Sequence, residues 1–202
     1  MAASRAKRSD FEVVTGIPSA DRATYSGSIA IRLSDIPMRG ETPLLPRGIA
    51  NREALYAFVW RSAPAHLPLF RTLRGGVLRF GSASQGYLRG RCREGIRALL
   101  WDGDPRAPFA VRHHSLAGWR SAENPVALSE LELVITYGEC AQVAEAIAVR
   151  TAARVSGYYP PGNQTNVGVR SGRFHSMRCF GHAGCIGEGE VLFRTFEALP
   201  AE

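Results

Sequence analysis

The residues best suited to chemistry lie near the end of the chain. Two histidines and two cysteines fall within eleven residues, in the order His175, Cys179, His182 and Cys185. Zinc binds Cys and His in a tetrahedron, and the glycines between these residues allow the backbone to turn tightly. Structural zinc sites usually take ligand pairs from separated elements, so burial of small cysteines is the competing interpretation. We predict no metal or other cofactor, with these four residues as the alternative metal site.

A second candidate is the pair Glu188 and Glu190. Residues two apart on a strand point to the same face, where one carboxylate can orient a ribose while the other assists a leaving group or nucleophile. The segment resembles the Glu-x-Glu element of ADP-ribosyltransferase toxins. That family also has an early Arg and a Ser-Thr-Ser strand, and no Ser-Thr-Ser occurs in this chain. The competing interpretation is a solvated turn whose acids pair with arginines.

Other catalytic signatures are absent from the sequence. It contains no Gly-x-Ser-x-Gly, no phosphate-binding glycine loop and no dinucleotide fingerprint. We therefore predict that the chain is not an enzyme, with an ADP-ribosyltransferase using Glu188 and Glu190 as the alternative.

Composition favours a globular protein that contacts polyanions or acidic surfaces. Of 202 residues, 45% are hydrophobic and 21% charged, and the formal net charge is +7. All basic residues except Lys7 are arginines, which make bidentate contacts with carboxylates and phosphates. Seven arginines fall between Arg71 and Arg97 against one acid, Glu94. Gathered on one face they would bind nucleic acid, and split between faces they would serve subunit contacts. The competing interpretation is that these arginines are simply solvated. No apolar run is long enough to cross a bilayer, and we expect no membrane partner.

The elements that must position these residues are mostly short strands. We predict a basic flexible arm over 1–10 and one β-sandwich domain over 11–202. Glycines and prolines spread along the chain supply turns between strands. The candidate strands are Phe11–Thr15, Gly27–Leu33, Leu73–Phe80, Gly86–Arg91, Gly95–Trp101, Phe109–His113, Leu128–Tyr137, Asn166–Arg170, Met177–Phe180 and Val191–Phe196.

Two segments have helical patterns. Asn51–Arg61 carries apolar residues at helical spacing behind a capping Asn. Ala141–Val155 is rich in alanine and is followed by Gly157, a residue that commonly ends helices. The alternation of Ile147, Val149 and Thr151 in the same segment leaves a strand as the competing interpretation. Few helices among many short strands favour a mainly β fold, either a sandwich or a barrel. We predict the antiparallel two-sheet sandwich, with one or two short helices.

Three segments, taken in order, resemble the coat proteins of picorna-like RNA viruses. They are Phe70–Phe80, Asn124-Pro125 leading to Leu131–Tyr137, and Gly187–Glu190 with Phe193. The resemblance implies an eight-stranded jelly roll that acts as a structural capsid or shell protein. It also implies assembly with copies of itself or with sibling subunits around RNA, in the virion and, during assembly, in the host cytoplasm. In that setting Arg5, Lys7 and Arg8 of the arm would bind the packaged RNA. A basic nucleic-acid-binding module is a further alternative.

Overall fold

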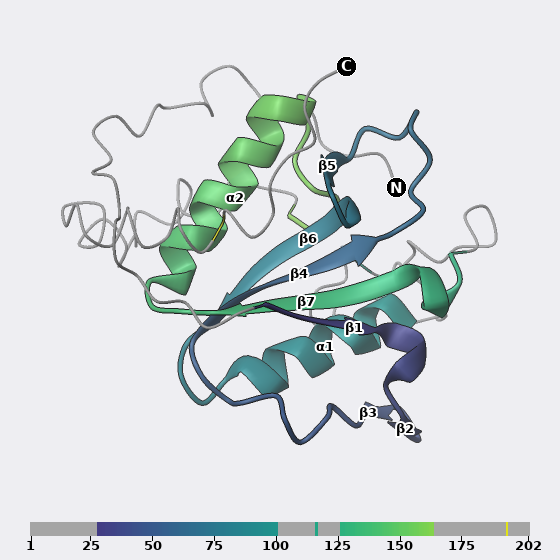
Figure 1. Cartoon of the computed structure of the whole chain (residues 1–202), viewed down its shortest axis with the longest axis vertical. Helices are drawn as coiled ribbons and strands as arrows, with labels where there is room; N and C mark the ends of the chain where they lie inside the picture. The colour runs from purple at the N-terminus through teal and green to yellow at the C-terminus, as the bar shows by residue number, and fades with distance from the viewer. Residues whose placement is uncertain (1–27, 101–115, 117–125, 164–192, 194–202) are drawn as a thin grey trace.

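The computed structural model describes residues 28–100, 116, 126–163 and 193. In these residues the fold is mixed: a five-stranded antiparallel sheet with one helix on each face, and a separate two-stranded hairpin (Figure 1). The elements in chain order are β1 (Ser28–Arg32), the 3-10 turn η2 (Leu33–Asp35), β2 (Met38–Arg39), β3 (Thr42–Pro43), β4 (Ala54–Trp60), β5 (Phe70–Thr72), β6 (Gly75–Ala83), α1 (Leu88–Leu100), the 3-10 turn η3 (Leu128–Glu130), β7 (Leu131–Tyr137) and α2 (Ala141–Ser156).

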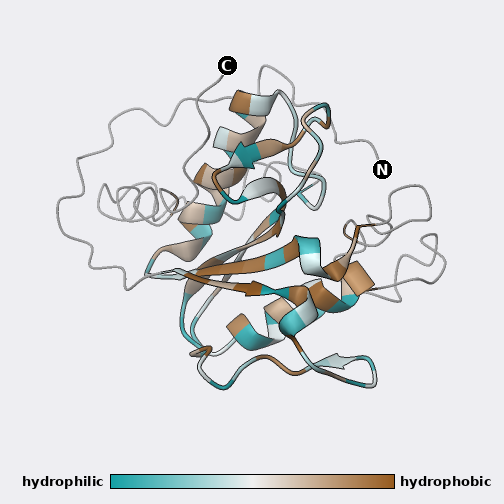
Figure 2. Cartoon of the chain, turned by 45° about the vertical axis from the view of Figure 1, so that its right-hand side comes forward, coloured by the Kyte–Doolittle hydropathy of each residue, from teal (hydrophilic) through white to brown (hydrophobic). Residues whose placement is uncertain are grey.

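The sheet has the strand order β1-β7-β4-β6-β5, so β4 lies at its centre. Side chains of β4 alternate between two apolar clusters: Tyr56 and Phe58 pack on the α1 side, whereas Leu55 and Val59 pack on the α2 side. A strand covered on both faces has no polar alternation, and it presents a continuous apolar run. The helix predicted over Asn51–Arg61 is therefore wrong. Figure 2 shows the resulting band of hydrophobic strands between the two helices.

Helix α1 covers one face of the sheet. Its buried residues Leu88, Cys92, Ile96 and Leu99 recur every three or four positions, which places them on one side of a helix. The strands predicted over Gly86–Arg91 and Gly95–Trp101 are therefore wrong. The arginines of α1 lie on the polar side of the helix, between its buried residues in the sequence, and they do not alternate as they would along a strand.

Helix α2 covers the opposite face, and the sequence predicted it correctly. Its many buried alanines bring the helix close to the apolar residues of β4 and β6. The helix ends at Gly157, whose φ of 76° is a left-handed conformation that favours glycine.

The predicted strands Gly27–Leu33, Leu73–Phe80 and Leu128–Tyr137 correspond to β1, β6 and β7 and are confirmed with small boundary shifts. Phe193 packs against the rings of Phe70 and Phe80. The remaining predicted strands, and the arm Met1–Asp10, lie outside the described residues: these strands are Phe11–Thr15, Phe109–His113, Asn166–Arg170, Met177–Phe180 and, apart from Phe193, Val191–Phe196.

The antiparallel sheet agrees with the predicted β-rich class, but its surroundings differ from a sandwich. Helices cover both faces of the five-stranded sheet, and the described residues place no second sheet face to face with it (Figure 1). The hairpin of β2 and β3 is a small separate sheet. None of the helices described has the length and apolar character required to span a bilayer.

Candidate active site

The site residues predicted from sequence all lie outside the described residues. They are Glu188 and Glu190 of the Glu-x-Glu element, His175, Cys179, His182 and Cys185 of the possible metal site, and Arg5, Lys7 and Arg8 of the arm. Within the described ranges, no three His, Cys, Asp or Glu side chains gather in a way that would hold a metal ion. The described residues instead bring together a different set of polar groups, around β6.

Within the described residues, one edge of β6 is only partly paired. Strand β5 pairs with Gly75–Val77 alone, so it covers only the first residues of β6. Next along this edge, the Gly162 N–H donates to the Leu78 carbonyl at 2.7 Å. Asn163 then bonds the Phe80 backbone twice, accepting from its N–H at 2.8 Å and donating to its carbonyl at 2.9 Å. Beyond Phe80, no described strand pairs with β6 on this side at Gly81–Ala83, where Gly81 and Ala83 are buried and Ser82 is partly exposed.

Tyr56 reaches this part of β6 from the α1 face of the sheet. Its side chain is 2% exposed, and its ring meets Phe58 edge to face, with centroids 6.1 Å apart. The ring lies across Gly81: a Cβ added at Gly81 would stand 2.4 Å from Cζ and 2.5 Å from Oη of Tyr56. Only glycine leaves room for the phenol in this position.

Glu145 reaches the same part of β6 from the α2 face. The Ser82 hydroxyl donates to Glu145 Oε2 at 2.5 Å. Desolvation raises the pKa of the Glu145 carboxyl, and the Ser82 hydrogen bond together with the charges of Arg79 and Arg91 lowers it in part. The net pKa shift is upward, so the protein holds this carboxylate in a less favourable setting than water does. Glu145 as a whole residue is nevertheless only partly buried.

Two arginines complete the cluster. Arg79 of β6 donates to the Gly162 carbonyl at 2.7 Å, and its buried Nε has no hydrogen-bond partner among the described residues. Arg91 of α1 is about half exposed and forms an ion pair with Glu94 at 3.6 Å. Both arginines act electrostatically on Tyr56 and on Glu145.

Tyr56 and Glu145 thus approach adjacent residues of β6 from opposite faces of the sheet, and the charges of Arg79 and Arg91 act on both. Burial raises the pKa of Tyr56, the two arginines lower it, and Cys92 and Glu145 raise it further. The net pKa shift is upward, so the phenol stays protonated at neutral pH. A neutral phenol, two guanidinium groups and a desolvated carboxylate form an arrangement typical of functional sites, where polar groups are placed at a cost to stability. We call Tyr56, Arg79, Arg91 and Glu145, with Ser82, the edge cluster.

Sequence reasoning missed the edge cluster for local reasons. Tyr56 was assigned to a helix, and Arg79 and Arg91 were counted only as part of a basic stretch. One signal was available: Glu145 is the only acidic residue in the alanine-rich segment Ala141–Ser156. An acid among residues that pack on a sheet requires a partner or a function.

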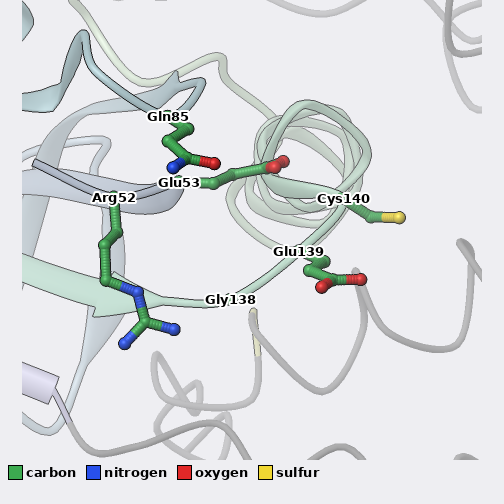
Figure 3. A pocket seen from close by; sticks show the side chains of 6 residues that line it. All are labelled: Arg52, Glu53, Gln85, Gly138, Glu139 and Cys140. Atoms are coloured by element: carbon green, nitrogen blue, oxygen red, sulfur yellow. The ribbon is translucent and has the colours of Figure 1, made fainter.

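A separate hollow of about 450 Å³ lies where α2 begins. It is lined by Arg52, Glu53, Gln85, Gly138, Glu139 and Cys140 (Figure 3). Glu53 Oε1 accepts the Ala141 N–H at 2.9 Å, so a carboxylate of the chain already occupies the start of this helix. Cys140 has a left-handed φ of 56°, and Figure 3 shows its side chain directed away from Glu53 and Gln85. The Arg52 guanidinium lies 5.9 Å from the centre of the Tyr137 ring. The hollow therefore resembles a capped helix start more than an anion site.

Comparison of the chain with protein-family models, with curated proteins and with solved structures finds no match. The functional inference therefore depends on the geometry of the edge cluster.

Proposed function

We propose that the chain hydrolyses phosphodiester bonds in a nucleic acid, using the edge cluster as its active site. The observation that carries the proposal is the convergence of Tyr56 and Glu145 on Gly81 and Ser82 from opposite faces of the sheet, beside Arg79 and Arg91. Of the three β6 residues at this point, Ser82 is the partly exposed one, so a substrate would approach the cluster at Ser82.

The two arginines suit the charge of the substrate. Phosphoryl transfer requires little covalent help from a protein, and its catalysis is mostly positioning and stabilisation of charge on the phosphoryl oxygens. Arg91 is accessible to solvent and can form bidentate contacts with a phosphate. Arg79 is fixed by Gly162, so its guanidinium needs little reorganisation when charge develops.

Glu145 suits a divalent cation. Mg²⁺ keeps several waters and is commonly bound by one or two carboxylates together with substrate phosphates. A single carboxylate with some solvent access fits that mode, whereas a closed site of several ligands is not found among the described residues. The cation would lower the pKa of a bound water and polarise the phosphate. Ser82 orients the carboxylate by its hydrogen bond.

Tyr56 would orient the attacking water. Its phenol is buried, remains protonated at neutral pH, and is near both arginines and Glu145. A protonated phenol can donate a hydrogen bond that orients a water for in-line attack, and the proton of that water would pass to bulk solvent once a bound cation had lowered its pKa. A basic chain with net charge +7 favours a polyanionic substrate, which makes nucleic acid the most suitable phosphodiester.

The direct test is cleavage of labelled single- and double-stranded DNA and RNA in Mg²⁺, followed by the same assay in EDTA. We expect cleavage that EDTA abolishes, and at least a hundredfold loss in Glu145→Gln and in Arg91→Gln, roughly the effect of removing one charged catalytic group. The matched control is Arg154→Gln, which removes an exposed arginine at the far end of α2. Absence of cleavage of all four substrates by the wild-type chain would refute the proposal, and so would full activity of Glu145→Gln.

A structural shell protein is the second proposal. The observation that favours it is the outer edge of β1, which pairs only with β7 in the described part of the chain. Exposed strand edges can pair with further copies. A jelly roll would also need a second sheet from residues outside the described ranges, and Arg5, Lys7 and Arg8 would contact packaged RNA. Electron microscopy of the purified chain tests this proposal: large closed assemblies support it, and a stable monomer at high concentration contradicts it.

The ADP-ribosyltransferase alternative stays a prediction. Its residues Glu188 and Glu190 lie outside the described ranges. Nicotinamide release from NAD by the wild type, lost in Glu190→Gln, would support it, and no release from the wild type would dismiss it.

A further inference from the structure

A second hollow, of about 470 Å³, lies at the other end of β6, where β5 turns into β6. Its walls are Arg61, Arg71, Thr72, Leu73, Arg74, Gly75 and Glu132. Figure 1 shows β5 and the start of β6 at one end of the sheet, well separated from the start of α2. We call this hollow the arginine pocket.

The arginine pocket has excess positive charge. Three guanidinium groups face one carboxylate, and that carboxylate belongs to Glu132, which pairs with Arg61 at 3.3 Å. Arg71 donates to the Ala63 carbonyl at 2.7 Å and to the Pro64 carbonyl. These contacts fix the Arg71 side chain without neutralising it, because carbonyl groups carry no net charge. Among the described residues, the pocket therefore keeps about two uncompensated positive charges.

The turn beside the pocket is rigid. The Thr72 hydroxyl accepts the Arg74 N–H at 3.2 Å and donates to the Gly75 carbonyl at 3.2 Å. Gly75 has a φ of 132°, and a Cβ there would lie 2.3 Å from the Trp60 carbonyl oxygen. The turn holds the backbone of Arg74 in place, and this side chain has no ion pair or hydrogen bond in the described ranges. Arg74 is thus a charged group available to an external anion.

Charge and position together point to one kind of ligand. We propose that the arginine pocket binds a backbone phosphate of the nucleic-acid substrate, at a fixed distance from the bond that is cut. This inference rests on the proposed function, because the edge cluster defines where the cut occurs. The pocket and the cluster are joined by β6: six residue steps separate Gly75 from Gly81, which is roughly 20 Å at about 3.3 Å per residue. A duplex rises about 3.4 Å per base pair, so the anchored phosphate lies about six base pairs from the cut.

The test compares Arg74→Gln with Arg154→Gln, which removes the same charge from an exposed position on α2. Duplex DNA of 24 base pairs is titrated by fluorescence anisotropy in EDTA, so that binding is measured without cleavage. We expect weaker binding for Arg74→Gln alone, and a salt dependence that is shallower by about one phosphate contact. The ratio of its Kd to the wild-type Kd should then fall about threefold between 50 and 200 mM salt.

The cleavage arm uses substrate length. In Mg²⁺, Arg74→Gln should raise KM on the 24-base-pair duplex and leave kcat unchanged. On a hairpin with a stem of five base pairs, which cannot reach from the edge cluster to the pocket, kcat/KM of Arg74→Gln should equal that of the wild type.

Equal losses in Arg74→Gln and Arg154→Gln would overturn the inference, and so would an Arg74→Gln defect of the same size on both substrates. If the wild type binds DNA through Arg74 but cuts nothing, the arginine pocket is confirmed as a phosphate site, whereas the proposed active site and the fixed distance to a cut are both refuted. If Arg74→Gln weakens the binding of labelled polyglutamate and leaves the binding of DNA unchanged, the pocket binds an acidic protein partner and the phosphate anchor is refuted.

Discussion

The ring of Tyr56 lies across Gly81, and a single methyl group at Gly81 would overlap both Cζ and Oη of the phenol. Because β4 and β6 pair at these two residues, the contact is fixed by the register of the sheet. The glycine allows a bulky side chain of the α1 face to reach an edge that Glu145 approaches from the other face.

Gly81→Ala is therefore expected to destabilise the fold by about 1–3 kcal/mol, the usual cost of inserting a methyl group into a packed core. It should also displace the phenol and reduce nucleic-acid cleavage. In a Tyr56→Ala background the added methyl group has space, and its cost should largely disappear, which a double-mutant cycle by urea unfolding measures.

The control for this substitution is Gly90→Ala. Gly90 lies on α1, and a Cβ there meets no atom within 4 Å. Alanine is favoured over glycine in helices, so we expect a gain of about 0.5–1 kcal/mol and unchanged activity. Equal effects of the two Gly→Ala changes would contradict the account of Tyr56 and Gly81.

Asn163→Ala tests the segment that bonds to β6 next to the edge cluster. Asn163 is 5% exposed and makes two hydrogen bonds to the Phe80 backbone, and its neighbour Gly162 accepts from Arg79. Loss of two buried hydrogen bonds should cost about 2–4 kcal/mol and lower kcat by moving Arg79.

Asn51→Ala is the matched control for Asn163→Ala. Asn51 also bridges two backbone groups, donating to the Gly86 carbonyl and accepting from the Arg89 N–H, but it is exposed. Water can replace these bonds, so the loss of stability should be smaller and kcat should not change. A larger effect at Asn51 than at Asn163 would show that the segment at Asn163 does not support the site.

The two described cysteines should differ in reactivity. Cys92 is fully buried, and burial raises the pKa of its thiol to about 12, whereas Cys140 is partly exposed. Because the thiolate is the reactive form, Cys140 should react with a disulfide reagent in the native chain, and Cys92 only after unfolding. The measurement uses a chain with Cys179→Ser and Cys185→Ser, and native reaction of a further Cys140→Ser chain would contradict it.

The comparison of sequence with structure shows which patterns were informative. Strand β7 was recognised because its apolar residues are bounded by turns, and α2 because a long alanine-rich run ends at Gly157. Strand β4 was taken for a helix, because burial on both faces removed the polar alternation that marks a strand. Pattern alone does not separate such short apolar runs from helices.

The arginines show why the candidate site was not predicted. Sequence reasoning treated Arg71–Arg97 as one basic stretch, yet the residues have separate tasks. Arg89 donates to three loop carbonyls, Arg71 to two, and Arg79 to one beside the edge cluster. Which carbonyls lie near each guanidinium depends on contacts between residues up to 83 positions apart, and no local pattern records them.

Glu145→Gln provides a prediction that separates stability from activity. The carboxyl has a folded-state pKa raised above its ordinary value of 4.5, mainly by desolvation. A raised pKa means that the wild type loses stability as the pH rises from about 4.5 through the folded-state pKa, because the buried group must then ionise. Glutamine keeps an acceptor for Ser82 and carries no charge, so the variant avoids this loss.

We expect Glu145→Gln to be more stable than the wild type at pH 8 in EDTA, with the difference in unfolding free energy shrinking toward pH 4. Urea unfolding at both pH values measures this difference. Added Mg²⁺ should then raise the Tm of the wild type and not that of the variant, since only a carboxylate binds the cation. A variant that is less stable than the wild type at pH 8 in EDTA, or one that gains as much from Mg²⁺, would show that Glu145 is an ordinary structural residue.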